Sequence, residues 1–146
     1  MARTDPLRHQ HGLAAQIVSR IIDKIDHYSG PDDAYRISLD LSKLLGLLRT
    51  HLAQEDVHFY PAMIQSGDPQ AGAAALSIAM EMGDLAERFE RFAARWSSSA
   101  VIAARFDRFR YDALTIFAKL EARIRRENEE LYPLADRLAD ALRTAA

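Results

Sequence analysis

Apolar residues recur every three or four positions over four long stretches of this chain, which is the spacing of one face of an α-helix. We expect helices at about 5–28, 33–65, 69–96 and 103–143. No stretch shows the pattern expected of a strand. The pattern of apolar and polar positions therefore predicts an all-α protein.

Turn-forming residues separate the four stretches. The first helix is expected to begin after Asp5-Pro6, a capping residue followed by a proline at the first helical position. The breaks are Ser-Gly-Pro-Asp after Tyr28, then residues 66–69, then the three serines at 97–99. Short connections between long amphipathic helices make neighbouring helices antiparallel. We therefore expect an up-down-up-down antiparallel four-helix bundle.

The two halves of the chain repeat one another. The segment HLAQEDVHFYP at 51–61 returns as RIRRENEELYP at 123–133, at a constant offset of 72 residues and without a gap. This offset places Glu55 over Glu127 and the first Tyr-Pro pair over the second. The repeat indicates a duplicated helical hairpin.

The length and the amino-acid composition favour one domain with a core of its own. A chain of 146 residues buries enough apolar surface to fold without disulfides or structural metals. We expect a single domain over residues 1–146, with the two hairpins at about 5–66 and 69–143. The absence of cysteine excludes disulfides, thiolate zinc sites and iron–sulfur clusters.

Charge and hydropathy bear on the partners and the compartment. The N-terminal segment has no apolar core of a signal peptide, and no stretch reaches the roughly 18 apolar residues of a membrane span. A formal net charge of -2 argues against general nucleic-acid binding, which requires a basic surface. We expect a soluble cytoplasmic protein that contacts neither membrane nor nucleic acid.

Four side chains that commonly bind metals fall on the apolar faces that must point into the bundle. They are His11 on the first helix, His51 and Glu55 one turn apart on the second, and Glu127 on the fourth. Carboxylates are rarely buried unless they are paired or bound to a cation. Imidazole with carboxylate suits iron, manganese or zinc, and bundles present such ligands from facing helices. Taken alone, His51 and Glu55 would also fit an ordinary surface pair.

The third helix contributes fewer polar groups to the expected interior. One candidate inward face contains Leu76, Ala79 or Met80, Gly83 and Ala86. A neighbouring stripe is more strongly apolar, and we expect its aromatic residues to pack in the core. That stripe consists of Met82, Leu85, Phe89, Phe92 and Trp96.

With these residues the chain resembles the hemerythrin-like (HHE cation-binding) domain family over almost its whole length. The resemblance implies a four-helix bundle with a non-haem di-iron centre that binds oxygen or reports oxygen, redox state or iron. The family pattern has a histidine on the first helix, H-x-x-x-E before Tyr-Pro on the second, a histidine on the third, and H-x-x-x-E before Tyr-Pro on the fourth. It implies that His11, His51, Glu55 and Glu127 are metal ligands.

The chain departs from the family pattern where the second iron would bind. The histidines of the third and fourth helices are replaced by Gly83 and Arg123. A guanidinium is planar and permanently charged, so Arg123 can donate to Glu127 and Glu55 from about where a cation would have stood. We expect Arg123 to substitute for the second metal.

Several versions of the site stay open at this point. A mononuclear site can survive beside Arg123, or Arg123 can neutralise the carboxylates so that no metal binds; an intact di-iron site is the third version. His58 lies three residues after Glu55 and is an additional candidate ligand. The two tyrosines of the repeat, Tyr60 and Tyr132, are candidates to hydrogen-bond the carboxylates, or belong to a purely architectural Tyr-Pro bend.

These observations favour a non-catalytic regulatory, sensing or binding module with a degenerate di-iron site, holding one iron, manganese or zinc ion or none. We expect a protein partner, and a homodimer is compatible with the sequence. The alternative is a non-haem iron protein that binds oxygen or acts as an oxidase. A phosphotransfer module would need an exposed histidine, whereas His51 lies on an inward face. No motif supports nucleophilic catalysis, and we expect no catalytic residues.

Overall fold

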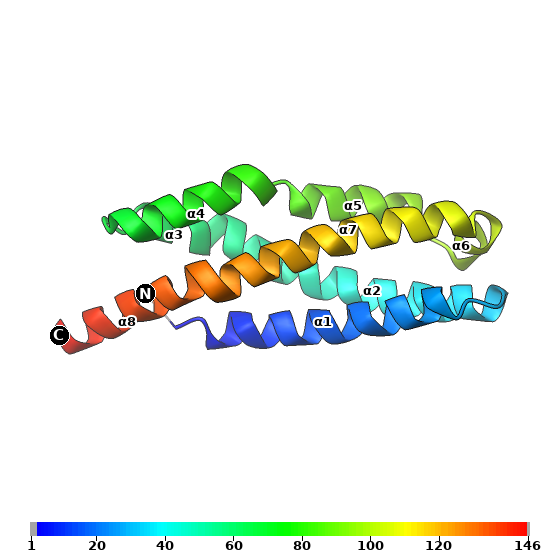
Figure 1. Cartoon of the computed structure of the whole chain (residues 1–146), viewed down its shortest axis with the longest axis horizontal. Helices are drawn as coiled ribbons and strands as arrows, with labels where there is room; N and C mark the ends of the chain where they lie inside the picture. Colours follow the sequence, from blue (N-terminus) through cyan, green and yellow to red (C-terminus); the bar gives the residue numbers. More distant parts are fainter. Residues whose placement is uncertain (1–2, 146) are drawn as a thin grey trace.

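A computed structural model, which describes residues 3–145, shows an all-helical bundle with up-down-up-down connections (Figure 1). It contains no strand within that range. The predicted fold class is therefore confirmed. Within residues 3–145, no helix combines the length and the apolar character needed to cross a membrane.

The first two arms of the bundle are the helices α1 and α2 with their extensions. Helix α1 spans Asp5–Asp26, and α2 spans Pro31–Gln54. Helix α2 continues through a π-helical segment η1, Glu55–Phe59, into the short helix α3, Tyr60–Ile64. The second predicted helix is thus one arm with a change of helical type inside it.

The other two arms also consist of several segments. The third arm is α4, Pro69–Met82, followed by α5, Leu85–Arg95. A short helix α6, Ser99–Ala104, leads into the fourth arm, which is α7, Phe106–Arg126, then η2, Glu127–Leu131, then α8, Tyr132–Ala145. Helix α1 begins and α8 ends at the same end of the bundle (Figure 1).

Local chemistry explains where the hairpins turn. Gly67 has φ of 82°, a left-handed conformation that glycine adopts without steric cost. Asp68 then caps α4, because its carboxylate accepts a hydrogen bond from the backbone N–H of Ala71 at 2.8 Å. A proline begins α4, where its missing N–H would have been unpaired anyway.

A π-helical turn precedes Tyr-Pro in each copy of the repeat. The N–H of Tyr60 bonds the carbonyl of Glu55, and the N–H of Tyr132 bonds the carbonyl of Glu127, each five residues back. The following proline has no N–H to donate to the carbonyl four residues back, so an extra residue is accommodated in the turn. The sequence had indicated only a bend at this place.

The third arm differs from its prediction in two ways. It is interrupted between Met82 and Leu85 instead of forming one helix. The face expected to contain Leu76 and Met80 is wrong, since these side chains are 50% and 80% exposed. The buried face of α4 is made of small residues and Ile78, and it continues the aromatic stripe of α5.

The size of the opposing side chains explains this choice of face. At this end of the bundle the core contains the larger side chains of Tyr60, Met63 and Leu131, all buried. Ala71 and Ala75 are buried against that end, where the space between the helices is already filled by larger side chains. Hydrophobicity alone favours Leu76 and Met80, but volume favours the alanines.

The apolar core consists of two clusters with a polar layer between them. The larger cluster runs from Ala14 to Leu120 and contains the aromatic residues of α5 and α7. The smaller cluster contains Tyr60, Met63 and Leu131. Between Leu120 and Leu131 along the fourth arm, the buried side chains are charged. The polar layer is therefore enclosed on both sides by apolar packing.

Asp40 of α2 is a buried carboxylate outside the polar layer, and it links α2 to α1 by hydrogen bonds. Its carboxylate is 6% exposed and accepts from Lys24 at 2.9 Å and Arg20 at 3.3 Å. Burial alone raises the pKa of Asp40, but the hydrogen bonds and charges of Lys24 and Arg20 together hold it below its ordinary value.

A carboxyl group with a lowered native pKa stabilises the fold above its unfolded-state pKa, and this stabilisation is lost as the pH falls through the native pKa. We expect Asp40→Asn to lower the free energy of unfolding by about 1–2 kcal/mol at pH 7, with the difference fading below about pH 4. Urea denaturation of both proteins between pH 7 and pH 3 measures it. A difference that stays constant over that range would contradict the assignment.

Candidate metal centre

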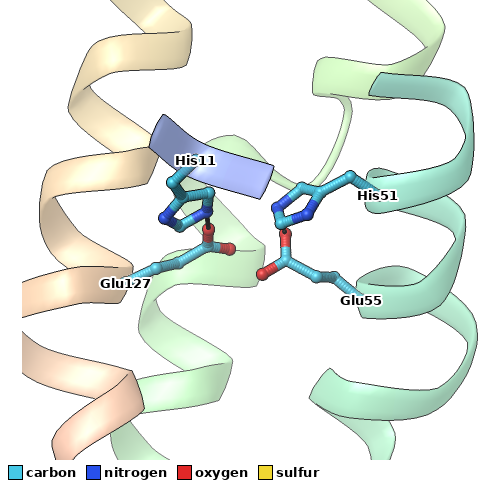
Figure 2. Close-up of side chains that lie close together, drawn as sticks. All are labelled: His11, His51, Glu55 and Glu127. Atoms are coloured by element: carbon cyan, nitrogen blue, oxygen red, sulfur yellow. Dashed lines mark hydrogen bonds and ion pairs between the residues drawn. The ribbon is translucent and has the colours of Figure 1, made fainter. Parts of the chain in front are cut away.

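The four predicted ligands converge in the polar layer. His11 comes from α1, His51 from α2, Glu55 from η1 and Glu127 from η2, and all four are buried. One potential ligand atom from each lies within 4.8 Å of the others. Figure 2 shows His11 with Glu127 on one side and His51 with Glu55 on the other, so that the two pairs face each other.

The site consists of two histidine–glutamate pairs. Nε2 of His11 lies 3.0 Å from Oε1 of Glu127, and Nε2 of His51 lies 3.1 Å from Oε1 of Glu55. The imidazole ring centroids are 4.8 Å apart. One pair joins the first helix to the fourth, and the other lies within the second arm. The two halves of the repeat thus share one site.

Side-chain amides orient both imidazoles. Nδ1 of His11 lies 2.8 Å from Oδ1 of Asn128, and Nδ1 of His51 lies 2.5 Å from Oε1 of Gln10. An amide oxygen accepts hydrogen bonds and cannot donate them, so these contacts favour the proton on each Nδ1. They direct the Nε2 lone pairs toward the carboxylates.

Nε2 of His51 is the polar atom whose surroundings fit a cation best. It is buried and makes no hydrogen bond, although the Glu55 oxygen lies 3.1 Å away. A lone pair facing a carboxylate oxygen is unfavourable unless a proton or a cation lies between them. Two imidazole nitrogens and two carboxylates are also ligands that iron, zinc and manganese accept. The residues present therefore fit a single metal ion.

Arg123 donates to both carboxylates, and at Glu55 it shares Oε1 with His51. Its Nε donates to Oε2 of Glu127 at 3.0 Å, and its Nη2 donates to Oε1 of Glu55 at 3.2 Å and to Oδ1 of Asp56 at 2.8 Å. The arginine is 1% exposed. Burial alone lowers the pKa of Arg123. The charges of the surrounding carboxylates raise it by more than burial lowers it, so the side chain stays protonated.

The two tyrosines of the repeat bind the carboxylates crosswise. Tyr60 donates to Oε2 of Glu127 at 2.6 Å, and Tyr132 donates to Oε2 of Glu55 at 2.5 Å. Each tyrosine therefore bonds the glutamate of the opposite half. Burial and the adjacent carboxylates raise the pKa of both phenols, which keeps them protonated as hydrogen-bond donors.

The two carboxylates have different electrostatic surroundings. Burial and the charge of Glu127 raise the pKa of Glu55 above its ordinary value. Burial opposes ionisation of Glu127 as well, but its contact with His11, the charge of Arg123 and the hydroxyl of Tyr60 together lower the pKa of this carboxyl. In the metal-free site Glu127 therefore ionises more readily than Glu55, and both accept hydrogen bonds from Arg123.

The backbone at Gly83 leaves no room for the histidine that the family pattern has on the third helix. A Cβ atom at this position would lie 2.4 Å from the carbonyl oxygen of Ala79, so any side chain requires the backbone to move. The break between α4 and α5 also frees the carbonyl of Met82, and Nη1 of Arg123 donates to it at 3.3 Å. Arg123 therefore bonds the third arm at the residue next to Gly83.

His58 lies outside this group. It is exposed on η1, and it is not among the four residues whose ligand atoms converge. In an ordinary α-helix His58, seven residues after His51, would lie on the same face as His51, whereas the π-helical turn changes the register after Glu55. The geometry gives no support to His58 as an additional ligand.

Three residues of the site were not expected from the sequence: Gln10, Asp56 and Asn128. Each is the sequence neighbour of a predicted ligand, and adjacent residues point about 100° apart around a helix. They reach the site from the seams between helices, not from the inward faces. Polar residues next to buried ligands are the signal that could have identified them.

The space at the site is small. A cavity of about 10 Å³ borders both imidazoles, Glu127 and Arg123, and is closed on the other side by leucines of α2 and α7. A cavity of this size holds about one water-sized group. It has no room for an organic substrate.

The family model of the hemerythrin HHE cation binding domain matches residues 2–135. The chain therefore belongs to the hemerythrin family. No curated protein and no solved structure gives a significant match to it.

The contacts of Arg123 predict its effect on stability. In chelator-treated protein, Arg123→Ala leaves two buried carboxylates without their cation, so we expect the free energy of unfolding to fall by about 3–5 kcal/mol. Arg126→Ala is the matched control, because Arg126 pairs with the exposed Glu81 and Glu130 and should cost at most about 1 kcal/mol. Urea denaturation compares the two variants; equal costs would contradict a special role of Arg123.

Proposed function

We propose that this protein is a non-catalytic regulatory or sensing module of the hemerythrin family that binds one metal ion. The ion is held by His11, His51, Glu55 and Glu127, and Arg123 takes the place of a second metal. The observation that carries this proposal is the buried, unbonded Nε2 of His51 beside three other converging ligand groups.

The position of Arg123 supports a count of one ion. Its guanidinium already donates to Glu55 and Glu127, the two carboxylates that a second ion would also need. It is permanently charged and would repel a second cation nearby. Gly83 offers no ligand atom on the third arm. A second metal is therefore opposed both by charge and by the missing ligands.

The dimensions of the site support a binding role over catalysis. An ion bound here would supply a Lewis acid and, if it were iron, a one-electron redox centre. The residues around it orient the imidazoles and exclude water, and the cavity of about 10 Å³ leaves no space for a substrate of more than a few atoms. Such a site is better suited to report metal occupancy than to transform a molecule.

A sensing role also implies that another molecule binds the protein differently when the metal site is occupied and when it is empty. We propose a protein partner or a second copy of the chain for this step, and a cytoplasmic location. These remain predictions from the sequence.

The metal content tests the proposal directly. Protein purified without chelator from cells supplied with iron, manganese and zinc should contain about one metal atom per chain by elemental analysis. His51→Ala should lose most of this metal, whereas His58→Ala, a control on the same arm, should retain it. Two irons per chain with oxo-bridge absorption, or no metal at all, would contradict the proposal.

The amides that hold the imidazoles give a finer prediction. Replacing Asn128 or Gln10 by leucine removes the acceptor that orients one ring, so we expect metal affinity to fall about 10- to 100-fold. Gln16→Leu is the control, since Gln16 is exposed on α1. Competition with a chromophoric chelator measures the three affinities. Unchanged affinity in both site variants would mean that the amides do not position the ligands.

A further inference from the structure

The charges around the site limit which ions it can hold. We infer that Arg123 and Asp56 make this a site for divalent ions that disfavours trivalent ones. The inference rests on the proposed function, since it concerns the ion that the site binds. It assigns Asp56, which is not among the converging ligands, a role in setting the valence of that ion.

The inference begins with the charged side chains of the polar layer. Among residues 3–145, Glu55, Glu127 and Arg123 are the charged groups fully buried there. Asp56 joins them through its contact with Nη2 of Arg123 at 2.8 Å, and its side chain is 33% exposed. Together these groups comprise three carboxylates and one guanidinium.

A divalent ion would balance these charges. Its two positive charges, with that of the guanidinium, equal the three negative charges of the carboxylates. A trivalent ion would leave one positive charge in excess inside an apolar enclosure. Uncompensated buried charge is costly because water cannot screen it there. If a second divalent ion stood in place of Arg123, the same carboxylates would face one more positive charge, and the net charge of the site would differ.

The partners of the histidines act in the same direction. Both Nδ1 atoms contact neutral amide oxygens, those of Asn128 and Gln10. A carboxylate in either place would add negative charge and make the imidazole a stronger donor, which favours the higher charge on the metal. The amides orient the rings without adding charge. Nothing in the immediate hydrogen-bond partners of the site therefore compensates a third positive charge.

Asp56 is suited to adjust this balance without binding the ion. Its carboxylate reaches Arg123 from the groove between α3 and α4, which has a volume of about 370 Å³ and is also lined by Gly83. Replacing Asp56 by asparagine removes one charge, keeps a similar shape and leaves all four converging ligands in place. The consequence for function is that bound iron would stay ferrous, and the module would respond to occupancy by a divalent ion.

Three variants distinguish an effect of charge on ion binding from an effect of side-chain structure. Asp56→Asn removes a negative charge, Arg123→Gln removes a positive charge, and Arg123→Lys keeps the charge while losing the planar fork. Dissociation constants for Zn²⁺ and for citrate-buffered Ga³⁺, a redox-inert trivalent ion, are measured for each variant and for the unchanged protein. The ratio of Ga³⁺ affinity to Zn²⁺ affinity is the quantity of interest.

We expect the unchanged protein to prefer Zn²⁺. The ratio should rise at least about tenfold in Arg123→Gln, fall at least about tenfold in Asp56→Asn, and stay close to the original in Arg123→Lys. In iron-loaded protein the midpoint potential should move accordingly, lower for Arg123→Gln and higher for Asp56→Asn. If Arg123→Gln does not fold, Asp56→Asn alone decides the question.

The outcomes distinguish this inference from the proposed function. If the two residues have a purely structural role, their replacement weakens the binding of both ions equally and leaves the affinity ratio unchanged. This result overturns the inference, while the proposed metal site stands. A preference of the unchanged protein for Ga³⁺ overturns it as well. Failure of the unchanged protein to bind either ion overturns the proposed function and, with it, the inference.

Discussion

The contact of one guanidinium with two buried carboxylates is the interaction on which this bundle depends. Glu55 and Glu127 lie in the interior because the second and fourth arms bring the two copies of the sequence repeat close together, and Arg123 donates to both. Without a positive charge there, the polar layer between the two apolar clusters would oppose folding. The break after Met82 leaves its carbonyl to accept a hydrogen bond from Arg123, so the chain itself supplies a positive charge beside the two carboxylates.

The repeat also explains the shape of the remaining contacts. Each π-helical turn ends at a Tyr-Pro pair, and each tyrosine reaches the glutamate of the other half. The extra residue in the turn, caused by the missing N–H of proline, fixes where the tyrosine hydroxyl points. The Tyr-Pro motif therefore has both an architectural and a polar role here, and the two halves are locked together by hydrogen bonds that cross between them.

Much of this arrangement could be predicted from the sequence. Helical periodicity and turn residues located the arms, and inward register brought out His11, His51 and the two glutamates. The charge and reach of Arg123 predicted its position beside them. What could not be predicted depends on volume and on neighbours in space. Alanines and not Leu76 are buried on α4, because larger side chains such as Tyr60 and Leu131 already fill the core there. Asp56 and Asn128 enter from the seams between helices, where periodicity carries no signal.

We propose that one ion binds between His11, His51, Glu55 and Glu127 and that Arg123 stands where a second would be. Anomalous diffraction from crystals grown with Mn²⁺ or Zn²⁺, recorded above and below the absorption edge of the metal, tests it most directly. The account predicts a single anomalous peak among His11, His51, Glu55 and Glu127, with the guanidinium of Arg123 still bonded to both carboxylates. Two peaks about 3.5–4 Å apart, with Arg123 displaced, would contradict it.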